Sequence, residues 1–194
     1  TDGVVMRKLV YYVGVTLDGY IAGPDHEVEF FPVPDELVAW INARYPETIP
    51  THIRNQVGLP AAENLAFDTL IMGRSTYEPA LSVGITSPYA HLRQYVVSTT
   101  LDVDDPAVTT STDPIGLVKA LKAEDGLDIW LCGGGKLAGA LLEEIDELII
   151  KRYPVVAGAG IPAFGGEFRP RPFSLTTSEQ FDNGTVVSWL TRTD

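Results

Sequence analysis

Asp128-Ile129-Trp130-Leu131-Cys132-Gly133-Gly134-Gly135-Lys136-Leu137 is the stretch around which the rest of this sequence can be interpreted. The apolar run 128–132 is typical of a buried strand, and after the glycines the run 136–144 predicts a helix. Glycines let another group approach the backbone closely, and the free N–H groups of a first helical turn favour an anion such as phosphate. A plain turn without a ligand explains the triplet equally well, so other stretches must decide.

Composition limits the classes of function. The chain has 194 residues, 45% of them hydrophobic, which fits one globular domain spanning 1–194, and no apolar run is long enough to cross a bilayer. A net charge of -12 argues against non-specific binding of nucleic acid. The single cysteine, Cys132, is expected to be a small buried residue rather than a nucleophile. The start of the chain lacks signal-peptide features, so we expect a cytoplasmic protein.

Strand and helix patterns alternate along most of the chain. Asn183-Gly184 between two alternating runs predicts a terminal hairpin. The segment 47–64 predicts an irregular excursion with a helical turn near 52–56. The fold class is therefore α/β, with a mostly parallel central sheet flanked by helices and a C-terminal antiparallel hairpin. The expected strands are 8–15, 68–73, 94–100, 128–132, 147–156, 175–181 and 185–191, and the expected helices begin at 34, 74, 115 and 136.

Polar or small residues follow four of these strands. In open α/β sheets, ligands bind beyond the carboxyl ends of the strands. Two helices would begin there, at Arg74 and at Gly135-Lys136, each with a cationic side chain beside its N-terminus. Two anion sites suit a dinucleotide better than a mononucleotide. Neither the standard Rossmann fingerprint nor a P-loop is present in the sequence.

The stretches 13–23, 70–77, 96–99 and 133–137, in this order, resemble the dihydrofolate reductase superfamily. The stretches 17–22 and 154–164 resemble its riboflavin-biosynthesis branch, the reductase domain of the deaminase-reductase, more than true dihydrofolate reductase. The resemblance implies NADPH as the cofactor and no metal. It implies that Arg74, Ser98 and Thr99 hold the 2′-phosphate. It also implies a further set around the pyrophosphate, ribose and nicotinamide: Gly14, Asp18, Ile21, Ala22, Gly73, Ser75, Thr76, Gly133, Gly134, Gly135, Lys136 and Leu137. Asp18 has an alternative role in shaping its own turn.

The proton donor is the least defined part of the resemblance. A carboxylate on the first helix serves in dihydrofolate reductases, which points to Glu36, with Asp35 beside it, although both also suit a helix N-terminus. Arg54 is expected either to meet an anionic group of the substrate or to lie at the surface.

The expected function is NADPH-dependent reduction of a small heterocycle, a ribosylated aminopyrimidine or a pteridine-like compound. The alternatives are a cofactor-binding protein without turnover, a true dihydrofolate reductase, and a structural interaction domain. The closing hairpin is expected to build a homodimer, so the expected partners are a small-molecule substrate and a second copy of the chain.

Overall fold

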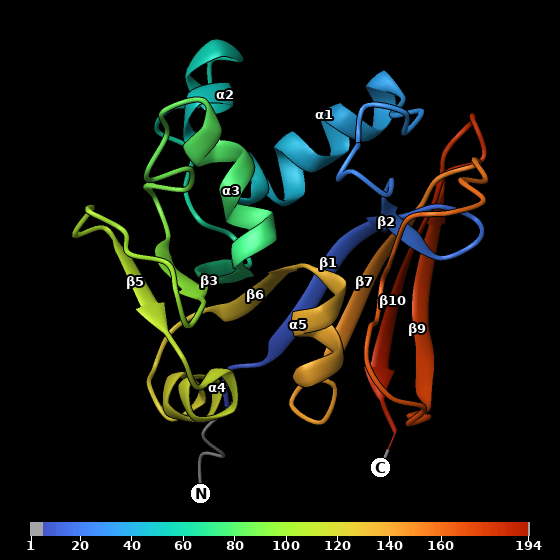
Figure 1. Cartoon of the computed structure of the whole chain (residues 1–194). Coiled ribbons are helices and arrows are strands. Elements are labelled where there is room, and N and C mark those ends of the chain that lie inside the picture. The colour runs from blue at the N-terminus through green and yellow to red at the C-terminus, as the bar shows by residue number, and fades with distance from the viewer. Residues whose placement is uncertain (1–5, 194) are drawn as a thin grey trace, which may run out of the picture.

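A mixed sheet of eight strands forms the centre of the protein (Figure 1). The computed structural model describes residues 6–193. Its elements in chain order are β1 Leu9–Val15, β2 Tyr20–Ala22, α1 Asp35–Arg44, the 3-10 helix η1 Pro46–Thr48, α2 Thr51–Gln56, β3 Phe67–Gly73, α3 Arg74–Ser82, β4 Arg93–Val97, β5 Val108–Ser111, α4 Pro114–Lys122, β6 Asp128–Gly133, α5 Gly135–Ala140, β7 Glu147–Arg152, β8 Ile161–Pro162, β9 Phe173–Gln180 and β10 Val186–Arg192.

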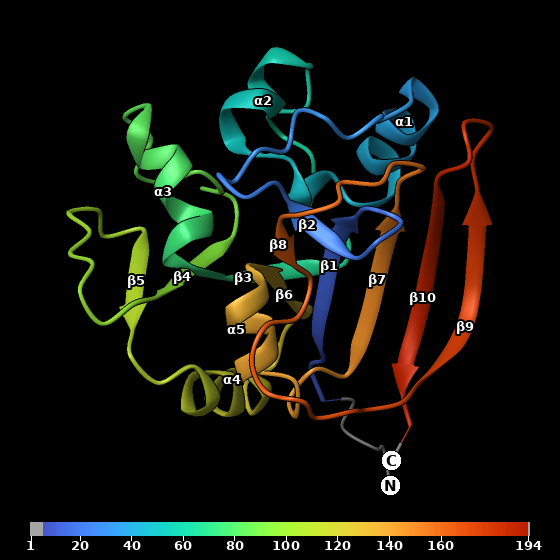
Figure 2. The same ribbon diagram turned by 45° about the vertical axis from the view of Figure 1, so that its right-hand side comes forward.

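The strand order is β5-β4-β3-β6-β1-β7-β10-β9. Every pair from β5 to β7 is parallel, whereas β10 is antiparallel to both β7 and β9. This confirms the predicted fold class, including the terminal hairpin at one edge (Figure 2).

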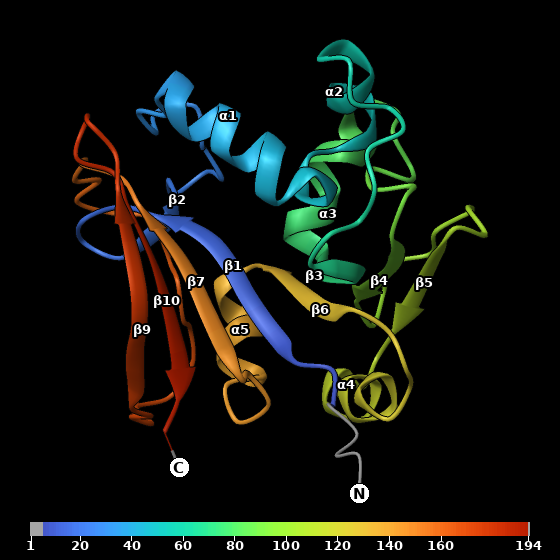
Figure 3. The same ribbon diagram turned by 180° about the vertical axis from the view of Figure 1, so that it is seen from behind.

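The central strand β1 is buried on both faces because helices cover each side of the sheet. Val10 and Tyr12 pack in the same apolar cluster as Leu37 of α1. Tyr11 and Val13 point the other way, into a cluster with α4 and α5. Figure 3 shows α1, α2 and α3 together beyond one end of the strands, with α4 toward the opposite end. Such two-sided burial explains the nearly continuous apolarity of residues 9–13.

Four strands differ from expectation. The edge strand β5 has no strong sequence pattern, since Thr109 and Thr110 are exposed. The strands β2 and β8 pair antiparallel and so join a predicted loop to a predicted glycine-rich bend. Strand β4 ends at Val97, so Ser98 and Thr99 lie in the following loop rather than in the strand.

The excursion between α1 and β3 contains η1 and α2, and the predicted helical turn near 52–56 is confirmed. Arg54 is only 2% exposed and donates hydrogen bonds to the carbonyls of Leu59 (3.1 Å) and Ala62 (2.5 Å). The expectation of a substrate-binding or surface arginine was wrong, because this side chain closes the loop after α2. Glu47, fully buried, accepts a hydrogen bond from the N–H of Leu65 in the same region.

Candidate functional site

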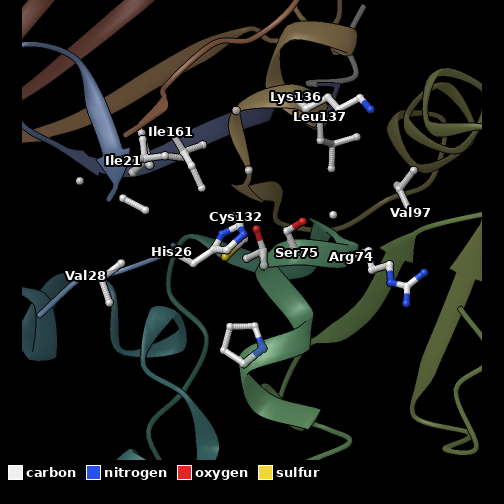
Figure 4. Close-up of a pocket in the computed structure, with 18 of the residues that line it drawn as sticks. Ile21, His26, Val28, Arg74, Ser75, Val97, Cys132, Lys136, Leu137 and Ile161 are labelled. Atoms are coloured by element: carbon white, nitrogen blue, oxygen red, sulfur yellow. The ribbon is translucent and has the colours of Figure 1, made fainter. Parts of the chain in front are cut away.

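A cavity of about 1090 Å³ opens at the carboxyl ends of the parallel strands. Its walls come from β1, β2, β6, α3, α5 and the segment 26–33, and Figure 4 shows residues of these elements facing a common space. Of the residues expected at the cofactor, the following line the cavity: Gly14, Ile21, Ala22, Gly73, Arg74, Ser75, Thr76, Thr99, Gly134, Gly135, Lys136 and Leu137. Asp18, Ser98 and Gly133 do not line it.

Two helix N-termini lie next to one another at this end of the sheet. Helix α3 begins at Arg74 directly after β3, and α5 begins at Gly135 one residue after β6. Because β3 and β6 are parallel neighbours, both helices start at the same edge. A Cβ built on Gly73 would lie 3.6 Å from the backbone nitrogen of Gly134. The arrangement aims two sets of free backbone N–H groups at one region of the cavity.

The three glycines 133–135 are required, or permitted, for different physical reasons. A Cβ on Gly135 would lie 1.9 Å from the carbonyl oxygen of Pro162, so this glycine permits close packing against the β8 segment. Gly133 has a φ of 131°, which favours glycine, and its peptide bond to Gly134 is cis.

Gly134 differs from both neighbours. It is extended (φ -90°, ψ -162°), and its Cβ would meet nothing closer than Thr76 Oγ1 at 3.6 Å. No contact within the protein requires a glycine there, so the missing side chain leaves free cavity space beside the helix start. A phosphate cradle needs this feature, and these residues therefore fit a pyrophosphate-bearing cofactor.

Cationic side chains gather at the same end of the cavity. Arg74 and Lys136 extend toward one side of the view in Figure 4, from α3 and α5 respectively. Arg74 donates to Thr100 Oγ1 and forms an ion pair with Glu78, one helical turn on, at 2.6 Å between Nε and Oε1. Both partners are about half exposed, so this pair is weak and can yield to a more highly charged anion.

Ser98 and Asp18 have local partners. The hydroxyl of Ser98 accepts hydrogen bonds from the N–H groups of Thr100 (3.2 Å) and Leu101 (3.0 Å) and so shapes the loop that presents Thr99. Asp18 accepts from Thr16 Oγ1 at 2.6 Å and from the N–H groups of residues 157 and 158 at 3.1 and 2.8 Å. These hydrogen bonds lower the pKa of Asp18 to about 2. The geometry matches the alternative role of Asp18, which shapes its turn and ties the β1–β2 loop to the chain after β7.

Asp35 and Glu36 lie on the first turn of α1, exposed, and neither lines the cavity. Leu37 is the fully buried residue of this helix and points into the core. At about 100° per residue, Glu36 and Asp35 are rotated away from that buried direction. The cavity wall therefore lacks the carboxylate that the resemblance placed on the first helix.

The rest of the cavity wall includes residues that the sequence patterns did not assign to a ligand. They are His26, Val28, Glu29, Phe31, Val33, Pro79, Tyr89 and Tyr153, together with Cys132. Phe31 packs against Tyr153 with ring centroids 5.0 Å apart. A Cβ on Gly14 would lie 2.8 Å from Tyr153 Cε2, so the ring of Tyr153 lies over the backbone of β1. No local pattern in the sequence marks Tyr153, which follows β7 without a glycine turn or a helix start beside it.

Cys132 is partly buried on the cavity wall, and burial raises the pKa of its thiol to about 12. A thiol with such a pKa stays protonated at neutral pH and is a poor nucleophile. Among residues 6–193 there is no group of three or more His, Cys, Asp or Glu side chains that could hold a metal ion. No helix in the described part of the chain is long and apolar enough to span a membrane.

Comparison with known proteins identifies a family and two relatives that match over most of the chain. The model of the family described as the RibD C-terminal domain matches residues 7–187. The uncharacterized Bacillus subtilis (strain 168) protein YwjB is 33% identical over 188 residues, which cover 95% of this chain and 98% of that protein. The uncharacterized protein YyaP of the same organism is 24% identical over 200 residues, covering 96% and 95%.

Two solved structures share the fold. A protein assigned by name to riboflavin biosynthesis, from Shewanella sp. PV-4, superposes with a TM-score of 0.68 at 23% identity, covering 96% of this chain and 99% of its own. A Thermotoga maritima diaminohydroxyphosphoribosylaminopyrimidine deaminase/5-amino-6-(5-phosphoribosylamino)uracil reductase gives 0.63 at 14% identity, covering 97% of this chain and 57% of its own.

Proposed function

This chain belongs to the RibD C-terminal domain family, and from that premise we propose that it is an NADPH-dependent reductase of a small heterocyclic substrate. The substrate class of the proposal is a ribosylated aminopyrimidine or a pteridine-like compound. The observation that carries the proposal is the pair of adjacent helix N-termini at Arg74 and Gly135, which open into one cavity beside the free space at Gly134.

The residues have separate tasks in this proposal. Arg74 and Thr99 bind the 2′-phosphate, and the backbone from Gly134 to Leu137 with Ser75 and Thr76 holds the pyrophosphate and ribose. Gly14, Ile21 and Ala22 border the nicotinamide. When bound, NADPH supplies a hydride, while the protein positions the substrate, excludes water and delivers a proton.

The cofactor assignment is tested by titrating the purified protein with NADPH and NADH while nicotinamide fluorescence is followed. We expect tighter binding of NADPH, and we expect Arg74→Ala to weaken NADPH by about 10- to 100-fold with little effect on NADH, since a charged hydrogen bond contributes about 1.5–3 kcal/mol. Arg93→Ala, on a neighbouring strand but outside the cavity, is the matched control. Binding of neither nucleotide, or equal loss of both, would contradict the assignment.

The substrate is tested with a panel of pterins and aminouracils that includes 5-amino-6-(5-phosphoribosylamino)uracil and dihydrofolate. NADPH oxidation with an aminouracil or a pterin supports the proposed reductase, and turnover of dihydrofolate alone indicates a true dihydrofolate reductase. Binding of NADPH without oxidation by any compound favours the alternative of a cofactor-binding protein that lacks turnover. The exposed position of Glu36 and Asp35 is the observation that keeps this alternative open.

A homodimer in the cytoplasm is also part of the proposal. Strand β9 forms one edge of the sheet, and seven of its eight residues are exposed, with Leu175 61% exposed. A long open edge is a pairing surface that proteins usually cover. Light scattering should give the mass of two chains, and Leu175→Glu should shift it toward one; a wild-type monomer would refute the dimer.

A further inference from the structure

Lys151 is a half-buried cation without an anionic partner among the described residues. It lies on β7 opposite Gly14 of β1 and Val187 of β10, on the sheet face that carries α1. Its Nζ lies 4.2 Å from the ring centroid of Tyr12, and no carboxylate of the described chain is within ion-pairing distance. A half-buried ammonium that lies over an aromatic ring, has no carboxylate beside it and is two residues from a cavity wall is a candidate for a functional group.

Tyr153 connects this lysine with the cavity. The two residues are separated by one position in an extended segment, so their side chains leave the same face about 6.6 Å apart along the chain. The N–H of Tyr153 still bonds to the carbonyl of Val15 at 2.9 Å, which continues the pairing of β7 with β1. The ring of Tyr153 lies over Gly14 and lines the cavity, where Gly14 is proposed to border the nicotinamide.

The ionisable groups around the pair favour proton exchange between them. Burial raises the pKa of the Tyr153 phenol, and the Lys151 ammonium opposes that rise, as a positive charge must. Burial lowers the pKa of Lys151, which Tyr153 and Cys132 oppose. Tyr12 contributes its ring from β1 and raises the pKa of Tyr153 further, and Val187 is the β10 residue opposite Lys151. Because the pKa of Lys151 is lowered and that of Tyr153 is raised, the Lys151 ammonium can return a proton to the Tyr153 phenolate.

The other titratable groups at this end are less suited. Glu29 is exposed at the mouth of the cavity and its carboxylate accepts a hydrogen bond from the N–H of Val28 at 3.1 Å. His26 is exposed in the same segment. Asp35 and Glu36 do not reach the cavity lining.

We propose that Tyr153 is the catalytic proton donor of this reductase. Lys151 acts through Tyr153 as a positioning residue, which returns a proton to the Tyr153 phenolate after each transfer. The proposal rests on the proposed function and adds the missing acid. It also names the bond that is reduced, a C=O or C=N whose heteroatom lies at the Tyr153 hydroxyl.

The reaction balances with a nicotinamide nucleotide as the reductant. The substrate carbon gains a hydride, with its electron pair, and the π bond to the heteroatom breaks. The heteroatom takes the proton of the Tyr153 phenol, the resulting phenolate takes a proton from the Lys151 ammonium, and the neutral amine regains one from water.

The first experiment does not depend on a substrate. NMR of the protein labelled in its lysine side chains, with the Lys151 signal assigned by its absence in Lys151→Arg, should show Lys151 titrating at lower pH than the other lysines. Tyr153→Phe should move this titration to still lower pH, whereas Tyr95→Phe, which alters a tyrosine outside the cavity, should not. A Lys151 that titrates with the other lysines, or that ignores Tyr153→Phe, overturns the proposal whether or not any turnover is found.

The second experiment uses the active compound from the panel of pterins and aminouracils. Tyr153→Phe should lower kcat on the order of 100-fold with unchanged NADPH affinity. Lys151→Met should lower kcat less and move the alkaline limb of the pH profile to higher pH, because the phenol loses the charge that lowers its pKa. Lys151→Arg keeps the positive charge but cannot release a proton, so it should restore little of kcat. Lys119→Met, on the exposed face of α4, should change nothing.

Full activity in Tyr153→Phe, or a loss seen only in Glu29→Gln, overturns the assignment of the donor. Failure of the proposed function is a separate result, namely no NADPH binding by the wild-type protein.

Discussion

The two ends of the cavity differ in how the chain builds them. The cationic end comes from two local units, in which a strand runs directly into a helix at Gly73-Arg74 and at Gly133-Gly134-Gly135. The aromatic end is assembled from Phe31 in the loop before α1, Tyr89 before β4 and Tyr153 after β7. A strand that runs into a helix can be recognised from consecutive residues of the sequence, whereas a wall built from distant segments cannot. The difference explains why the expected cofactor residues largely line one cavity while the substrate end was missed.

The largest expected effects come from substituting two adjacent glycines at the cationic end. Gly135→Ala should lower the free energy of unfolding by about 3 kcal/mol, because its Cβ would lie 1.9 Å from the backbone oxygen of Pro162. Gly134→Ala should destabilise far less yet abolish most NADPH binding, since its Cβ enters free cavity space. Urea unfolding and NADPH titration of both variants test this. Equal destabilisation by the two would mean that packing alone explains the motif.

A smaller effect is expected from a substitution at the aromatic end, which should leave the cationic end unchanged. Phe31→Leu removes ring contacts with Phe30 (4.5 Å) and Tyr153 (5.0 Å) and should cost about 1 kcal/mol of stability. NADPH affinity should remain within about twofold, because none of these rings belongs to the proposed phosphate sites, while the KM for the reducible substrate should rise. Thermal unfolding and steady-state kinetics measure the two effects. A parallel loss of NADPH affinity would show that the two ends are not independent.

The smallest expected effect concerns Asp18, which ties the β1–β2 loop beside the cavity to the chain after β7. Its pKa is about 2 in the folded protein against 3.8 for the free group, so its contribution to stability is complete above about pH 4 and is lost as pH falls toward 2. Asp18→Asn should remove this part of the acid dependence and leave stability less sensitive to pH between 4 and 2. Thermal melts across that range, compared with Asp25→Asn in a neighbouring exposed turn, provide the check.

Local patterns in the sequence were sufficient for most of the fold. The apolar run of β1 and the Asn183-Gly184 turn each predict their element from a few neighbouring residues. Helix α4 is equally local, since the side chain of Asp113 accepts a hydrogen bond from the N–H of Gly116 at 3.0 Å. The strand-end motifs likewise predict where two helix N-termini meet, because parallel strands end at one edge.

Orientation and long-range pairing were not available from the sequence. Glu36 has the residue type of a proton donor, but the packing of Leu37 turns it toward solvent. Lys151 and Tyr153 are unremarkable in the chain and become a pair beside the cavity only because β7 lies against β1.

By itself the sequence determined the α/β class and the parallel order implied by alternating elements. That Arg74 and the glycines around 133–135 bind phosphate stays a prediction. Only the tertiary structure decided that Gly134 leaves open space while Gly135 packs, that Asp18 ties two loops together, and that the first helix sends no carboxylate to the cavity. The physical reason is the distance along the chain between the residues that interact. Helix starts and turns depend on bonded neighbours, whereas the facing of a side chain depends on which distant segment occupies the space beside it.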